Sequence, residues 1–219
     1  MMICVVRLRK FSVEALFMRD TTDEWKAFLN PEIVRTKLIS AGLFLVAHEM
    51  LIDSIKRHPL SFFANRWTTD GPEPSKRYTT EVLALDPKGK DDALRGSIAW
   101  LRNAEAITSE DESDIRKVTD ARNEVAHQMS AMVSGSKPPD FANHFATLMA
   151  LVQKIEKWWI VNVEVATDPD FDRQEIDEDG IISGPSWSMQ ILARVALGEG
   201  DEAWELHREF VKQTSKDSG

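Results

Sequence analysis

The chain has 219 residues, of which 42% are hydrophobic, and its formal net charge at pH 7 is -9. This length is enough to bury a core within one main domain, and the acidic balance excludes a protein that coats nucleic acid indiscriminately, because such coating needs clustered cations. Cys4 is the only cysteine, which excludes an intrachain disulfide and a cysteine-based zinc finger, and we expect a reducing, cytoplasmic setting.

The first 30 residues form an N-terminal segment ahead of the first clear helix. The segment opens with MMICVVRLRK, in which a short apolar piece precedes the cations. A secretory signal peptide has the opposite order and a small-residue cleavage site. We therefore expect a short strand, a helix start or a non-native upstream extension here.

Residues 31–57 have the pattern of a long amphipathic helix. Asn30 and Pro31 are a favourable cap and first-turn pair. Apolar side chains then recur every three or four positions, at Ile33, Ile39, Leu43, Val46, Met50 and Ile55. We expect the helix to end before Pro59. The stretch LISAGLFLVAHEMLIDSI contains a histidine and two acidic residues, so it lacks the roughly 18 uninterrupted apolar residues of a membrane span, and we expect no membrane partner.

Residues 64–90, ANRWTTDGPEPSKRYTTEVLALDPKGK, predict a long loop. They are polar and rich in proline and glycine, with at most one short strand near Glu81–Leu85. Loops of this length are often functional. The best local cations for attracting RNA to the acidic chain are Lys76, Arg77, Lys88 and Lys90.

Two helices are expected after this loop. One covers about residues 91–101. The next begins near Ser109, where Ser109 and Glu112 have the spacing of a capping box, and it ends near Gly135. The apolar stripe of this second helix consists of Ile115, Val118, Ala121, Val125, Met129 and Met132.

The rest of the chain also predicts helices. Residues 141–166 space their apolar side chains by fours and threes, the pattern of a helix about 40 Å long. Residues 168–219 hold five Lys or Arg against thirteen Asp or Glu, which indicates an acidic linker before helices over 186–197 and 201–214. The predicted fold is all-α, an antiparallel helical bundle with a main domain over 31–167 and a C-terminal helical extension over 168–219 packed on it.

Three polar residues stand out on the helix that begins near Ser109. On a helical wheel Arg122 falls about 40° from the centre of the apolar stripe, whereas Asn123 and His127 share a face about 140–180° round from it. Burying an unpaired guanidinium costs on the order of several kcal/mol. Arg122 therefore needs an anionic ligand or a partner such as Glu49 or Asp53 of the first helix.

The string RNEVAH, Arg122–His127, resembles the signature of the HEPN superfamily, an arginine followed after four to six residues by a histidine, often with asparagine directly after the arginine. The resemblance rests on this string and on the helix order over roughly residues 30–167. It implies an all-α domain that dimerises so that two motifs face one cleft. Active members are metal-independent endoribonucleases of phage-defence, abortive-infection and toxin–antitoxin systems. Some members carry a tyrosine two residues after the histidine, and Met129 at this position argues against regulation by modification there.

The resemblance implies a role for each of the three residues. Arg122 would bind the scissile phosphate, His127 would act as general base or acid, and Asn123 would orient the imidazole or the phosphate. The implied partners are a second copy of the chain, an RNA substrate and an antitoxin protein, without a cofactor. The other histidines show no metal-ligand spacing, so no metal site is expected.

Two other interpretations stay open at this point. The first is a non-catalytic HEPN-like helical module that binds a nucleotide or a partner protein in the same cleft. The second is a structural dimer in which an internal salt bridge occupies Arg122.

Overall fold

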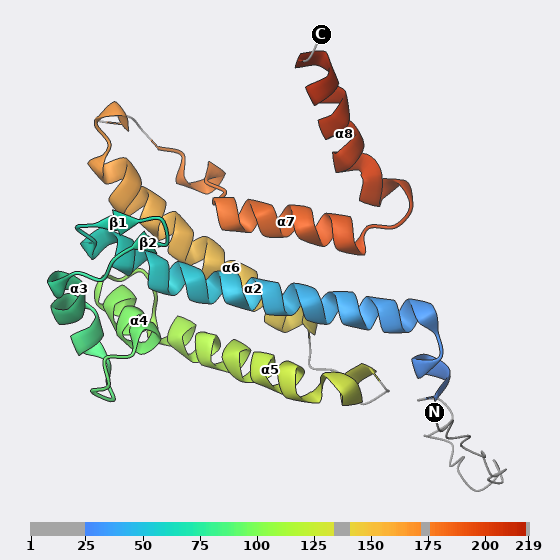
Figure 1. Ribbon diagram of the computed structural model, residues 1–219, viewed down its shortest axis with the longest axis horizontal. Coiled ribbons are helices and arrows are strands. Elements are labelled where there is room, and N and C mark those ends of the chain that lie inside the picture. Colours follow the sequence, from blue (N-terminus) through green and yellow to red (C-terminus); the bar gives the residue numbers. More distant parts are fainter. Residues whose placement is uncertain (1–24, 134–140, 172–175, 218–219) are drawn as a thin grey trace, which may run out of the picture.

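The computed structural model describes residues 25–133, 141–171 and 176–217, and this part of the chain is all-α, as the sequence predicts (Figure 1). The main helices are α2 (Pro31–Phe63), α4 (Ala93–Asn103), α5 (Ser109–Val133), α6 (Phe141–Trp159), α7 (Gly184–Leu197) and α8 (Asp201–Asp217). The shorter elements are β1 (Trp67–Thr68), β2 (Gly71–Pro72), the helix α3 (Lys76–Glu81) and the 3-10 turn η2 (Leu83–Leu85). The strand or helix start expected within residues 1–10 lies outside the described residues.

Helix α2 is longer than its apolar pattern predicts. Asn30 caps it as expected, because its Oδ1 accepts hydrogen bonds from the backbone N–H groups of Glu32 and Ile33 at 3.0 and 3.3 Å. The predicted end before Pro59 is wrong, since the helix continues through Pro59 to Phe63. An interior proline costs roughly 3 kcal/mol, and the burial of Pro59 and Phe63 offsets that cost.

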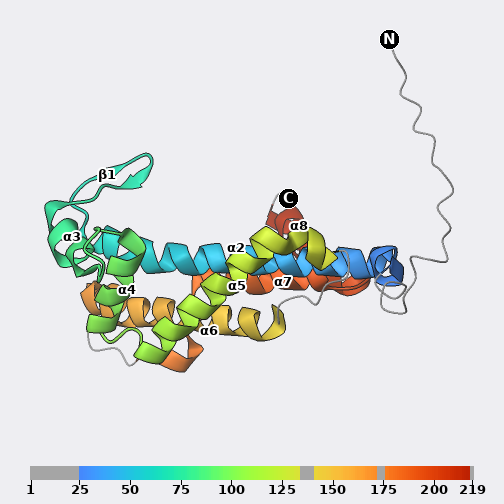
Figure 2. The same ribbon diagram turned by 90° about the horizontal axis from the view of Figure 1, so that it is seen from below.

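The other main helices are arranged around α2. Helices α4, α5, α6 and α7 all pack against it. Figures 1 and 2 show that α5 runs opposite to α2, as predicted for an antiparallel bundle. Helix α6, the most extensive neighbour of α2, runs in the same direction, so the antiparallel prediction is wrong for this pair. By length and composition α2 could cross a membrane, a test that the core helix of a soluble protein also passes. In this fold α2 supplies the centre of the core.

The core combines apolar side chains from most of these helices. Its largest fully buried members include Phe44, Leu51 and Ile55 of α2, Leu101 of α4, Ile115, Val118 and Val125 of α5, and Leu148, Val152 and Ile155 of α6. Each such side chain contributes about 1.5–3 kcal/mol through burial. Around the C-terminal end of α2, aromatic rings continue the core: Phe62 and Phe63 contact Trp100, which meets Trp158 edge to face.

The long loop after α2 is more ordered than the sequence predicts. Its first part is the β1–β2 hairpin, and α3 and η2 occupy the place of the strand expected near Glu81–Leu85, so that expectation is wrong. The segment is helical because helical spacing places Tyr78 and Val82, four residues apart, on one face, where both are buried against Phe63. Turn η2 then lies directly on α4, where a Cβ added to Gly96 would be 2.6 Å from the carbonyl oxygen of Val82.

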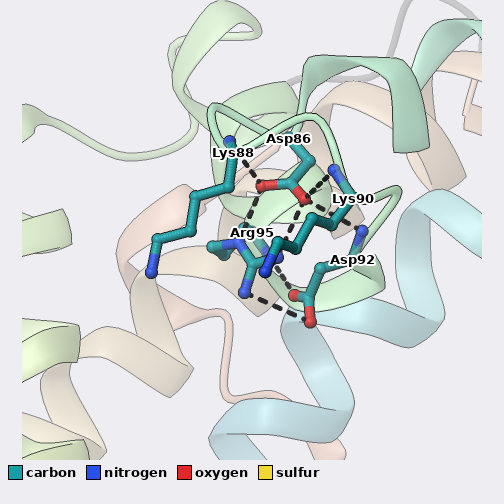
Figure 3. A network of polar contacts seen from close by, with 5 residues as sticks. All are labelled: Asp86, Lys88, Lys90, Asp92 and Arg95. Carbon is teal, nitrogen blue, oxygen red and sulfur yellow. Dashed lines mark hydrogen bonds and ion pairs between the residues drawn. The ribbon is translucent and has the colours of Figure 1, made fainter.

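A buried carboxylate fixes the last part of this loop (Figure 3). The Asp86 side chain accepts hydrogen bonds from the backbone N–H groups of Lys88, Lys90 and Asp92 at 3.0–3.2 Å. The Arg95 guanidinium donates to both oxygens of the same carboxylate, at 2.7 and 2.8 Å. The Arg95 hydrogen bond is the main reason that the pKa of Asp86 lies far below its usual range. This network attaches the loop to the first turn of α4.

The C-terminal part of the chain folds back along the bundle. Helix α6 continues as a π-helical turn over Ile160–Val165, so the regular helix predicted for 141–166 changes form near its end. Helix α7 packs against α2 and α6, and α8 packs against α7. Figure 1 shows α8 leading away from the bundle.

Candidate active site on helix α5

A capping box starts the helix that carries the motif. It consists of Thr108 and Asp111, not of Ser109 and Glu112 as predicted: the Thr108 hydroxyl oxygen accepts from the Asp111 backbone N–H at 3.2 Å, and the Asp111 carboxylate accepts from the Thr108 backbone N–H at 2.7 Å. The box is displaced by one residue from the predicted one because the helix starts at Ser109, which makes Thr108 the cap, and Glu112 forms ion pairs with two arginines instead.

The buried face of α5 matches the predicted stripe. Ile115, Val118, Ala121, Val125 and Met132 are buried and Met129 is half-buried. Asn123 and His127 are exposed on another side of the helix, one turn apart, as the helical wheel predicts. The imidazole of His127 has no hydrogen-bond partner among the described residues, so it is free to meet a ligand or a second chain.

Arg122 lies between the buried and exposed faces. Its Nη2 donates to Glu49 Oε1 of α2 at 3.2 Å, which confirms one of the two partners predicted within the chain. The other candidate, Asp53, pairs with Arg57 instead. The Arg122 side chain is 37% exposed and also reaches Asn123 Oδ1 at 3.5 Å, a weak contact. Its Nε is buried and has no hydrogen-bond partner within the described part of the chain. The guanidinium is therefore anchored at one end and accessible at the other.

A buried histidine, His48, lies beside this ion pair and was not among the predicted site residues. His48 Nε2 is 3.2 Å from the hydroxyl oxygen of Thr119. That hydroxyl donates to the Ile115 carbonyl oxygen at 2.7 Å, so it accepts from His48, which places the imidazole proton on Nε2. The Nδ1 atom is then an acceptor that is buried, has no hydrogen-bond partner in the residues that the structure describes, and lies 3.8 Å from Glu49 Oε1.

The electrostatics keep His48 neutral. Burial lowers its pKa, the nearby Glu49 raises it and Arg122 lowers it, and the result lies below the usual 6.5. A neutral His48 leaves the negative charge of Glu49 available to Arg122. The only sequence signal for His48 is its position next to Glu49, which by itself does not distinguish it from a packed core histidine.

A second histidine–carboxylate pair lies nearer the C-terminal end of α2 and was not predicted. His58 Nε2 is 2.8 Å from Glu156 Oε1, and the imidazole stacks on Trp159 with ring centroids 4.5 Å apart. Burial raises the pKa of Glu156, but hydrogen bonds from His58 and Ser54 outweigh this effect, so the pKa lies below its usual value. The pair borders a cavity of about 520 Å³. No spacing in the sequence could link residues that are 98 positions apart.

A single chain therefore does not bring Arg122 and His127 to one point. Arg122 faces α2, and His127 faces outward from α5. Among the described residues no three His, Cys, Asp or Glu side chains lie close enough together to hold a metal ion. Comparison with protein-family models, curated proteins and solved structures finds no match to this chain.

Proposed function

We propose that this protein is a metal-independent endoribonuclease of a toxin–antitoxin or phage-defence system, with a composite site that combines Arg122, Asn123 and His127 from two HEPN-type subunits. The observation that carries the proposal is the accessibility of the three side chains on neighbouring turns of α5. Asn123 and His127 are exposed, and Arg122 is held by Glu49 with part of its guanidinium open to solvent.

A second copy of the chain supplies what one chain lacks. Arg122 and His127 diverge on α5, and a twofold axis near them would set the arginine of one subunit against the histidine of the other. Exposed apolar side chains on the same face of α2 as Glu49 support an interface along this face: Leu38 and Val46 are 47% and 42% exposed. On a helical wheel both lie within about 60° of Glu49, and burying them in a dimer is favourable.

The residues suit cleavage through the neighbouring 2′-hydroxyl. His127 as general base takes the 2′-hydroxyl proton while the 2′-oxygen forms a bond to phosphorus and the bond from phosphorus to the 5′-oxygen breaks. The leaving 5′-oxygen receives a proton from water, and the His127 imidazolium then gives its proton to the hydroxide that remains, so each site needs one arginine and one histidine. Arg122 stabilises the charge that develops on the phosphate oxygens. The products are a 2′,3′-cyclic phosphate and a 5′-hydroxyl.

Purified protein tests the proposal when it is incubated with total RNA in the presence of EDTA. We expect cleavage by the wild type, a loss of about 10²- to 10⁴-fold in His127→Ala and of about 10²- to 10³-fold in Arg122→Ala. Matched controls are His207→Ala, an exposed histidine of α8, and Arg35→Ala, an exposed arginine of α2. RNA left intact by the folded wild type, or equal activity in the motif variants, would refute the nuclease.

Mixing the two inactive variants tests the composite site. A heterodimer of Arg122→Ala and His127→Ala subunits keeps one complete pair, the arginine of one subunit with the histidine of the other. After subunit exchange at equal concentrations, about a quarter of the wild-type activity should return, because half of the dimers are mixed and each has one of two sites. No recovery would mean that both residues act from the same subunit.

One observation favours a second candidate function, a non-catalytic module that binds a nucleotide or a partner protein in the same cleft. The Arg122–Glu49 ion pair already supplies the guanidinium with an anionic partner inside the chain, which a binding module tolerates more easily than a nuclease. Expression in cells separates the two: toxicity relieved by either Arg122→Ala or His127→Ala supports the nuclease, and unaltered growth favours the module.

A further inference from the structure

A cavity of about 560 Å³ lies between the end of the long loop, α4 and α5, and it does not include the motif. Its size is within the range of about 300–1,000 Å³ typical of small-molecule sites. Leu94 and Ile98 of α4 and Ile115 of α5 give it an apolar wall. Four of its charged lining residues are cations and two are carboxylates, the reverse of the balance in the whole chain.

Two of these cations converge on a single anion. Arg102 Nη1 of α4 donates to Glu112 Oε2 at 2.9 Å, and Arg116 Nη1 donates to Glu112 Oε1 at 2.8 Å. Each guanidinium has five N–H donors, and these two side chains are 47% and 64% exposed. Most of their N–H donors are therefore available to a ligand. A pair of guanidinium groups that converge on one oxyanion is an arrangement that binds phosphate.

The remaining cations differ in what they can do. Arg95 is bound on both sides, to Asp86 and Asp92, and so is part of the wall. The backbone of Lys88 is fixed by Asp86, and Figure 3 shows its side chain extending away from that carboxylate. Lys88 forms no ion pair with any described residue. It adds a free ammonium group to a rigid edge of the cavity.

We propose that this cavity binds a nucleoside phosphate, with the base on the apolar wall and the phosphate between Arg102 and Arg116. A nucleoside phosphate matches the site because it joins an aromatic ring to a compact anion. The phosphate takes donors that Glu112 leaves unused, and Lys88 contributes further positive charge.

Two sources share this chemistry, a free nucleotide and one nucleotide unit of an RNA chain. The second source rests on the proposed nuclease function, and the geometry of α5 supports it. Arg116, Asn123 and His127 are separated by seven and four residues, so they lie on one face of the helix. The distance from Arg116 to His127 along the axis is about 16 Å, from eleven residues at 1.5 Å each. An RNA strand held in the cavity can follow this face to the motif.

Calorimetric titration of the full chain with AMP tests the site. We expect binding that weakens about ten- to a hundredfold in Arg102→Gln and in Arg116→Gln, because each removes charge-assisted hydrogen bonds. Glu112→Gln should strengthen binding about threefold or more, because it removes a carboxylate that competes for the same donors. Arg35→Gln is the matched control and should bind as the wild type does. Absent AMP binding, or an affinity unchanged in all three cavity variants, would overturn the proposal.

Further ligands and one variant separate the two sources and the two proposals. A 2′-O-methyl oligoribonucleotide, which cannot be cleaved through its 2′-oxygen, should bind at least tenfold more tightly than AMP and be displaced by it if RNA is the source; AMP binding as tightly as the oligonucleotide identifies the free nucleotide. Both results retain the site. His127→Ala should leave AMP affinity unchanged. If the protein binds AMP but does not cleave RNA, the nuclease proposal alone is rejected. If it cleaves RNA, and the cavity variants have the same AMP affinity and the same KM for RNA as the wild type, the cavity proposal alone is rejected.

Discussion

Replacing Gly96 by alanine probes how tightly the loop is attached to α4. A Cβ at this position would be 2.6 Å from the Val82 carbonyl oxygen and 3.2 Å from the Leu83 Cα, both backbone atoms. Ordinary contact starts at 3.4 Å, so η2 and α4 would have to separate by about 0.8 Å, the difference between 3.4 and 2.6 Å. A rotamer change cannot relieve this clash, because the atoms belong to the main chain.

The expected net effect is a loss of about 2 kcal/mol in the free energy of unfolding. Overpacking costs about 1–3 kcal/mol, and a backbone clash belongs at the upper end of that range. Alanine returns about 1 kcal/mol through its higher helix propensity. For a chain of this size, a loss of about 2 kcal/mol lowers Tm by roughly 4–8 °C.

Gly42 of α2 provides the matched control, because a Cβ added there meets no atom within 4 Å. Gly42→Ala should raise the free energy of unfolding by up to about 1 kcal/mol and Tm by roughly 2–4 °C. Urea unfolding followed by circular dichroism measures both variants against the wild type. A Gly96→Ala protein as stable as Gly42→Ala would refute the close approach of η2 to α4.

Three other outcomes are expected. Folding lowers the pKa of His48, so below about pH 6.5 the unfolded chain binds more protons than the folded one. The free energy of unfolding therefore falls with decreasing pH, by at most about 1.4 kcal/mol per pH unit. In urea titrations His48→Gln should flatten this slope, and an equal slope would contradict the lowered pKa of His48. Thr108→Ala should cost about 1 kcal/mol in urea unfolding and Ser109→Ala much less, since only Thr108 caps α5; equal losses would restore the box predicted from the sequence. Folding lowers the pKa of Asp86, so the stability that its carboxylate contributes is present above the ordinary pKa of 3.8 and is lost as the pH falls below that value. The Tm difference between the wild type and Asp86→Asn should therefore shrink below pH 3.8. A difference that stays constant would argue against the ion pair with Arg95.

Local patterns in the sequence predict most of the helices, and tertiary contacts explain where those predictions fail. The cap at Asn30 and the stripe of α5 depend on neighbouring residues alone, so they are readable from the sequence. Pro59 and the segment Glu81–Leu85 are different. Burial overrides their local preferences. Pro59 is buried in the bundle, and Tyr78 and Val82 are buried against the ring of Phe63 at the end of α2.

The same distinction applies to the sites. The wheel position of Arg122 requires an anionic partner, which restricts the choice to a few acidic residues and makes Glu49 predictable. The pairing of Arg102 and Arg116 with Glu112 was not predictable, because the Arg102 contact depends on how closely α4 approaches α5. The His58–Glu156 pair was not predictable either, since its residues meet only after α2 and α6 are packed.

The parallel packing of α2 on α6 has a consequence for how the chain folds. The two helices are separated in sequence by 77 residues, between Phe63 and Phe141. Their docking therefore closes a long loop, and the chain loses the conformational entropy of that loop before the core is complete. We expect truncations of core side chains between α2 and α6 to slow refolding. Truncations between α7 and α8, which are close in sequence and lie outside this loop, should mainly accelerate unfolding.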